Sequence, residues 1–198
     1  MIAPDQCASN MNQVNMKLKF YIIIALIVMT LTTNDMRAQN STTGFSGKRV
    51  SRSATISLHW PLDKVFTLFE PEPEKKWADD WDFTLIYSKS GKAEELMMFH
   101  VTGKHDSKSL WIITKYDLKN RNIQYTVYRP THVTVITINC TSGEENTTNA
   151  TITYTYTGLI DEGNGHIEEL ANQMYARNLK DWEEAINHYL ETGRTKKH

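Results

Sequence analysis

Apolar residues recur every three or four positions between Asp161 and Gly193, and this spacing predicts a long amphipathic helix. The apolar face carries Ile167, Leu170, Ala171, Met174, Trp182, Ala185, Ile186 and Tyr189, and the opposite face carries Glu169, Gln173, Lys180, Glu184 and Asn187. Acidic Asp161 and Glu162 suit the positive end of the helix dipole, and Gly193 is a typical stop residue. Such a helix needs an extended apolar partner.

The chain before this helix alternates apolar and polar residues in short runs separated by turn residues, as antiparallel strands do. The final run is the clearest, because Ile152, Tyr154 and Tyr156 alternate with threonines and predict one apolar and one hydroxylated face. The predicted strands cover about Arg49 to Leu58, Phe83 to Tyr87, Leu96 to Thr102, Ser109 to Tyr116, Ile123 to Arg129, His132 to Cys140 and Ala150 to Gly158.

Helical spacing also appears after the first strand. Apolar residues between Pro61 and Pro71 predict one short helix, and Glu74 to Asp79 predicts a further helical turn that carries Trp77. The predicted order is therefore strand, two short helices, six strands and a long helix. This order favours an α+β fold in which a curved antiparallel sheet of about seven strands packs on the C-terminal helix.

These features resemble the START-like, polyketide-cyclase-like (SRPBCC) superfamily, which has the helix-grip fold. The resemblance covers about Arg49 to Thr192 and is carried by Pro61 to Phe66, the Glu74-Lys75-Lys76-Trp77 segment with Trp81, Ser109 to Trp111, Tyr116-Asp117, Glu162 to Asn164 and Trp182. It implies an apolar cavity between the sheet and the C-terminal helix, where members bind lipids, sterols, polyketides or other hydrophobic molecules. Some members catalyse cyclisation or hydrolysis there, but this sequence has no catalytic signature.

The N-terminal region predicts an export signal. Lys17 and Lys19 precede an apolar core from Phe20 to Leu31, which is shorter than the ~20 residues that span a bilayer, and Ala38 suits a cleavage site. The alternative is an uncleaved anchor that holds the domain outside the membrane. We expect an extension and signal peptide over 1–38, a flexible linker over 39–48, a START-like helix-grip domain over 49–193 and a basic tail over 194–198.

Composition and charge narrow the function classes. A formal net charge of −1 gives no reason to expect nucleic-acid binding, and a mean hydropathy of −0.49 excludes a polytopic membrane protein. Cys7 would be lost with the leader, and Cys140 lies in an alternating run that predicts a small buried hydrophobe. The seven histidines show no paired spacing, so the sequence predicts neither a metal site nor a cofactor.

Candidate ligand-binding residues lie on the apolar phases of the strands and of the last helix: Trp111, Tyr125, Tyr154, Tyr156, Met174, Asn178 and Trp182. Core packing explains the aromatic members nearly as well. Asn178 falls within the apolar stripe, where its amide needs a partner, either a strand, a trapped water or a ligand. Arg129 is either a guard at the cavity mouth or an exposed strand end.

The function predicted first is an exported binding protein that holds a small hydrophobic ligand or lipid between the sheet and the helix. The alternative is a cyclase or hydrolase that acts on a polyketide-like or ester substrate in the same cavity, although no Gly-x-Ser-x-Gly elbow is present. A third interpretation is a sensor or interaction module with a filled core. The N-terminal segment implies membrane proximity, and the sequence predicts no oligomeric state.

Overall fold

The computed structural model describes residues 44–102, 109–174 and 179–197. All the described helices and strands belong to one compact unit, Phe45–His198. The strands of this unit are β1 (Arg49–Leu58), β2 (Phe83–Tyr87), β3 (Met98–Val101), β4 (Leu110–Asp117), β5 (Asn122–Tyr128), β6 (His132–Ser142) and β7 (Thr148–Gly158). Its helices are α2 (Leu62–Val65), the 3₁₀ turn η1 (Phe66–Phe69), α3 (Pro71–Glu74), α4 (Asp161–Gln173) and α5 (Leu179–Thr192).

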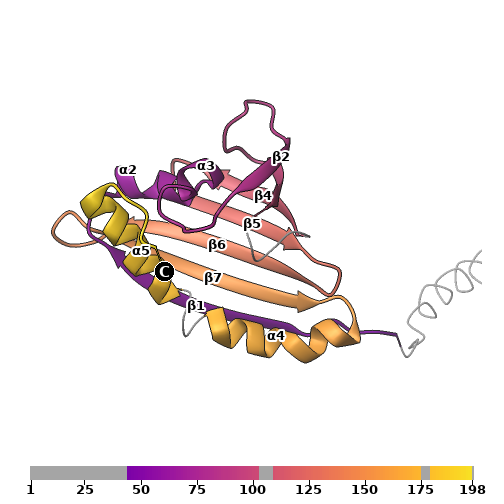
Figure 1. The fold of residues 1–198 in the computed structure, drawn as a ribbon. Coiled ribbons are helices and arrows are strands. Elements are labelled where there is room, and N and C mark those ends of the chain that lie inside the picture. Colours follow the sequence, from indigo (N-terminus) through magenta and orange to yellow (C-terminus); the bar gives the residue numbers. More distant parts are fainter. Residues whose placement is uncertain (1–43, 103–108, 175–178, 198) are drawn as a thin grey trace, which may run out of the picture. The chain divides into compact units, whose positions relative to one another are not determined.

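All seven strands form one antiparallel sheet in the order β1-β7-β6-β5-β4-β3-β2 (Figure 1). The first strand therefore pairs with the last, while β2 to β7 follow one another as a meander. β4 shifts register between Ile113 and Lys115, and β2 does so between Leu85 and Tyr87. The predicted α+β architecture and its strand count are confirmed.

The two faces of the sheet differ as the alternating pattern predicts. In β7, Ile152, Tyr154 and Tyr156 are buried on the face toward the helices. On the other face, hydroxyls of β1 and β7 pair across the strands, with oxygen to oxygen distances of 2.9 Å from Ser53 to Thr153 and 2.8 Å from Thr55 to Thr151. The burial of apolar side chains thus fixes which way each strand faces.

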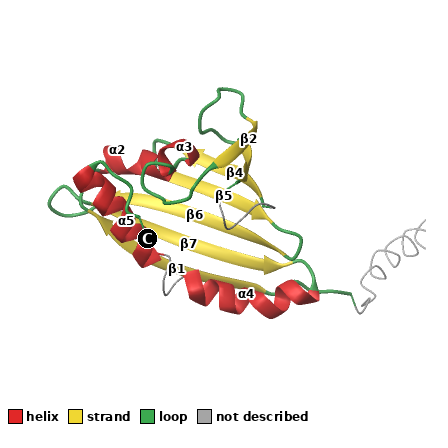
Figure 2. Cartoon of the chain, viewed as in Figure 1, coloured by secondary structure: helices red, strands yellow, loops and turns green. Residues whose placement is uncertain are grey.

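The helices lie over the buried face of the sheet (Figure 2). The predicted C-terminal helix is described as two segments, α4 packed on β7 and β1 and α5 packed on β1, whose axes run in different directions in Figure 1. At the start of α4, a Cβ on Gly163 would collide with the carbonyl oxygen of Thr131. Asn164 accepts a hydrogen bond from Lys48 N at 2.7 Å and donates one to Ser46 O at 2.9 Å, which fixes this start beside β1.

One residue of the predicted polar face is placed differently from expectation. Asn187 is buried, with its Oδ1 accepting from His59 N at 2.9 Å and its Nδ2 donating to Ser57 O at 3.0 Å. These bonds satisfy backbone groups at the end of β1, where the chain leaves the sheet. The prediction that Asn187 faces solvent is therefore wrong, because an amide with two backbone partners is stable inside.

Within the described residues, no helix is both long enough and apolar enough to cross a bilayer. The apolar segment from Phe20 to Leu31 lies outside those residues.

Candidate ligand-binding site

A cavity of about 530 Å³ lies between the buried face of the sheet, the segment that runs from η1 to β2, and helices α4 and α5. Its lining mixes three kinds of side chain. The aromatic ones are Phe69, Trp81, Trp111, Tyr125, Tyr154, Tyr156 and Trp182; the aliphatic ones are Ala78, Val101, Val127, Ile136, Ile138, Leu170 and Met174; the polar ones are Glu74, Asp79, Asp80, Arg129, His132, Thr134 and Gln173. A volume of this size suits a small organic ligand.

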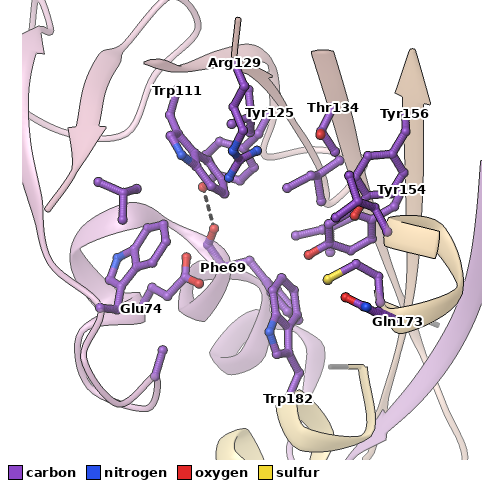
Figure 3. A pocket seen from close by; sticks show the side chains of 18 of the residues that line it. Phe69, Glu74, Trp111, Tyr125, Arg129, Thr134, Tyr154, Tyr156, Gln173 and Trp182 are labelled. Carbon is purple, nitrogen blue, oxygen red and sulfur yellow. Dashed lines mark hydrogen bonds between the residues drawn. The ribbon is translucent and has the colours of Figure 1, made fainter. Parts of the chain in front are cut away.

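The aromatic wall on the side of β4 and β5 is held by hydrogen bonds from its polar atoms to other parts of the chain. Trp81 Nε1 donates to Pro71 O at 2.9 Å, and Trp111 Nε1 donates to Ser109 Oγ at 2.9 Å. Tyr125 Oη donates to Phe69 O at 2.6 Å, the bond drawn in Figure 3. Because these polar atoms are already paired with the protein, the rings present mainly apolar surface to a ligand.

The opposite wall is formed by β7 and α5. Tyr154 and Tyr156 stack with their ring centres 6.1 Å apart, and the ring of Trp182 meets Tyr154 edge-on at 6.3 Å. Burial raises the pKa of Tyr156 to about 12 and also raises the pKa of Tyr154. Both phenols therefore stay neutral at physiological pH and can donate or accept one hydrogen bond.

Two polar groups stand out in this apolar setting. Glu74 is only 9% exposed, and its burial raises the pKa of its carboxyl well above the ordinary value. Its carboxyl makes no hydrogen bond or ion pair with any residue that the structure describes. Thr134 Oγ1 is also buried without a hydrogen-bond partner among the described residues. Buried polar groups are usually paired, so both require an explanation.

The other titratable groups that line the cavity differ in exposure. Asp79 and Asp80 are exposed, while Arg129 is half-buried. His132 is buried, with its Nδ1 2.9 Å from Thr131 Oγ1.

Cys140 is buried as predicted, and burial raises its thiol pKa to about 12, so it stays protonated and is a poor nucleophile. No group of three or more potential metal ligands occurs among the described residues.

Comparison with known proteins gives structural relatives only. No protein-family model matches the sequence, and no curated protein matches it. Among solved structures, norcoclaurine synthase from Thalictrum flavum in complex with dopamine and hydroxybenzaldehyde aligns with a TM-score of 0.58 at 11% identity, covering 80% of this chain and 99% of that one. The chain has the START-like helix-grip fold. Two further structures with this fold support the assignment.

One is Ara h 8.0201, with a TM-score of 0.56 at 14% identity, covering 74% of this chain and 99% of that one. The other is a START superfamily protein from Mycobacterium smegmatis, with a TM-score of 0.53 at 9% identity, covering 71% and 97%. At such low identity the helix-grip fold is shared, while chemistry has to be argued from the residues of this chain.

The helix-grip cavity brings together most of the candidate residues chosen from sequence. Trp111, Tyr125, Tyr154, Tyr156, Met174 and Trp182 line it, and Asn178 lies outside the described residues. That these residues bind a ligand stays a prediction. The hydroxyl of Tyr125 is bonded to Phe69 O, so this ring offers apolar surface where a polar contact was also considered.

Sequence reasoning missed several lining residues: Phe69, Glu74, Trp81, Thr134 and Gln173. Gln173 was assigned to the polar face of the helix, and although exposed it borders the cavity, because it lies on the last turn of α4. For Glu74 one signal existed. It is three residues before Trp77 and four before Ala78, the spacing of one helical face, and Trp77 is almost fully buried.

Proposed function

We propose that this protein binds a small, mainly apolar organic molecule in the cavity between the sheet and helices α4 and α5. The observation that carries the proposal is the cavity itself, about 530 Å³ of space bounded mostly by aromatic and aliphatic side chains. A core that served stability alone would be filled, because protein interiors pack about as densely as organic crystals. Empty apolar space of this size costs stability unless a ligand fills it.

The polar groups on the lining support a ligand with a polar end. Thr134 Oγ1 and the Glu74 carboxyl have no partner among the described residues, and the Tyr154 phenol stays neutral. In ligand sites, a few such groups fix the orientation of a molecule that apolar contacts hold in place. The ligand is therefore amphipathic, with a body that contacts the rings and a polar end that meets these groups.

Saturable binding of a neutral lipophilic probe tests the proposal. The fluorescence of N-phenyl-1-naphthylamine rises in apolar surroundings, and we expect one probe to bind per protein molecule and to be displaced by competing ligands. Native mass spectrometry of freshly purified protein should also show a retained small molecule. An unsaturable fluorescence increase together with the bare protein mass would sink the proposal.

An enzyme that works in the same cavity is the second candidate. The observation that favours it is Glu74, because burial raises the pKa of its carboxyl well above the ordinary value and so favours the protonated form that a general acid needs. A hydrolase would turn over 4-nitrophenyl esters with a rate that falls when Glu74 is replaced by Gln. Equal rates for the two proteins would remove this candidate.

We also propose that the protein is exported, either to the periplasm or to the outside. Lys17, Lys19, the apolar core from Phe20 to Leu31 and Ala38 support this proposal. N-terminal sequencing of protein from fractionated cells should find a mature chain that begins at Gln39. An intact leader in the membrane fraction would instead favour the uncleaved anchor.

A further inference from the structure

Glu74 is held rigidly against the cavity. Its backbone N donates to Glu70 O at 3.0 Å, and its carbonyl accepts from Trp77 N at 3.2 Å and from Ala78 N at 2.9 Å. Figure 3 shows its carboxyl directed into the cavity, across from Tyr154. The short helix α3 and the turn after it therefore fix the backbone from which this side chain reaches the cavity.

Three neighbouring carboxylates have partners among the described residues, whereas the Glu74 carboxyl has none there. Glu70 accepts a hydrogen bond from Tyr116 Oη at 2.6 Å, and Lys75 Nζ lies 3.1 Å from Glu72 Oε2 and 3.0 Å from Asp82 Oδ1. Within the described part of the chain, no donor reaches the carboxyl of Glu74. An unpaired buried carboxyl is costly, so a hydrogen-bond donor on a bound molecule would stabilise Glu74 where the described residues supply none.

The surroundings of Glu74 favour a donor over an acceptor as that partner. The nearby donors Trp81 Nε1 and Tyr125 Oη are bonded to backbone carbonyls, so a ligand group that only accepts hydrogen bonds finds few donors on this side. The rings of Phe69, Trp81 and Trp182 line the same cavity and offer π surfaces that attract cations. The carboxylates of Asp79 and Asp80 on the same lining add negative potential.

We infer that the cavity takes a ligand with a protonated amine, which pairs with the Glu74 carboxylate while its apolar body packs against the aromatic walls. This inference rests on the proposed function and specifies its ligand class. Before binding, burial disfavours the ionised carboxyl, and an arriving ammonium group stabilises that ionised form. Arg129 and His132 also line the cavity, so an anionic ligand is the competing outcome.

Three naphthalene ligands that differ only in their polar end test the inference: 2-(1-naphthyl)ethylamine, 2-(1-naphthyl)ethanol and 1-naphthylacetate. Isothermal titration calorimetry with the full chain should give an affinity for the amine about tenfold or more above that for the alcohol, as expected for a hydrogen bond to a charged group. In Glu74→Gln we expect this preference to disappear, measured as the ratio of the affinities for amine and alcohol in the same variant. Glu72→Gln, which removes a more exposed carboxylate of the same helix, is the matched control and should keep the preference.

The outcomes separate the inference from the proposed function. Equal binding of amine and alcohol by the wild-type protein, tightest binding of naphthylacetate, or an amine preference that survives in Glu74→Gln would each overturn the amine and leave a binding cavity. Failure of all three ligands and of the neutral probe to bind would overturn both. If the Gln variant does not fold, the order of the three affinities in the wild-type protein still tests the inference. Glu74→Met offers a second neutral replacement.

Discussion

Threonines lie on both faces of the sheet, but their hydroxyls differ in whether a neighbouring strand pairs with them. On the outer face, Ser51 Oγ lies 2.9 Å from Thr155 Oγ1, and Thr114 Oγ1 lies 3.2 Å from Thr126 Oγ1. On the inner face, Thr134 Oγ1 is buried with no partner among the described residues. The outer-face hydroxyls thus pair across strands, while the described residues leave the inner-face hydroxyl of Thr134 without a partner.

This difference separates hydroxyls that pair within the sheet from a hydroxyl that lines the cavity. Hydroxyl pairs on the outer face each contribute modestly to cross-strand pairing. On the inner face, most side chains pack against one another, as Ile152 does with no exposed surface, but those around the cavity lack contacts on one side. The inner face therefore contains both a packed core and the lining of a cavity.

The largest expected effect separates the packed part of the inner face from the outer face. Ile152→Ala removes a fully buried side chain and should lower the free energy of unfolding by ~2–5 kcal/mol. Thr153→Ala removes only the hydroxyl bonded to Ser53 and a small apolar group, and should cost about 1 kcal/mol or less. Urea unfolding measures both, and equal losses would mean that the two faces contribute alike.

A cavity-filling pair distinguishes binding surface from core. Ile136 lies between Tyr125 and Tyr154 in the strand register and lines the cavity. Ile136→Trp should therefore place an indole ring inside the cavity. We expect the affinity for N-phenyl-1-naphthylamine to fall about tenfold or more, a loss of about 1.4 kcal/mol or more. Val135→Trp, on the outer face between Thr126 and Thr155, is the control and should bind the probe as the wild type does. Unchanged binding by both variants would place the probe elsewhere.

Much of the fold could be predicted from sequence because two periodicities are strong in it. Alternation in β7 assigned Tyr154 and Tyr156 to the inner face, and helical spacing assigned Ile167 and Ala171 to the buried face of α4. Asn187 was misplaced, because its two backbone partners come from the end of β1, far away in sequence, and no local pattern reveals such bonds.

The residues of the candidate site also differ in whether a local sequence pattern indicates their buried side. Tyr154 and Trp182 were found because they lie on long elements whose buried face can be read from periodicity. Glu74 was missed because α3 has only four residues, so its spacing to Trp77 and Ala78 was the single local signal for its buried side. Its direction is set by tertiary contacts, so a charged residue in a polar-looking segment reaches the interior.

The stability of Glu74→Gln at different pH values tests whether the inner face holds a carboxyl at a cost. Burial raises the pKa of the folded carboxyl, so between the unfolded value of 4.5 and the raised value the native state keeps a proton that the unfolded state has lost. Wild-type stability from this group is therefore full below pH 4.5 and falls as the pH rises. Each unit of pKa difference corresponds to about 1.4 kcal/mol.

We expect Glu74→Gln to be more stable than the wild type at neutral pH and to match it in acid, as measured by thermal unfolding without ligand. Asp79, Asp80, Arg129 and His132 line the same cavity in both proteins, so their own titration largely cancels in the difference. A difference that does not change with pH would show that the carboxyl is solvated in the folded state.

The smallest effect compares one threonine from each face. Thr134→Val replaces a buried hydroxyl that has no partner among the described residues, so it should be neutral or stabilise the fold by about 0.5–1 kcal/mol. Thr153→Val deletes a hydroxyl that is 2.9 Å from Ser53 Oγ and should destabilise it by a similar amount. Urea unfolding of the two variants should therefore give changes of opposite sign. If Thr134→Val were the more destabilised of the two variants, the Thr134 hydroxyl would be hydrogen-bonded in the folded protein. The two faces would then not differ in how they pair their threonine hydroxyls.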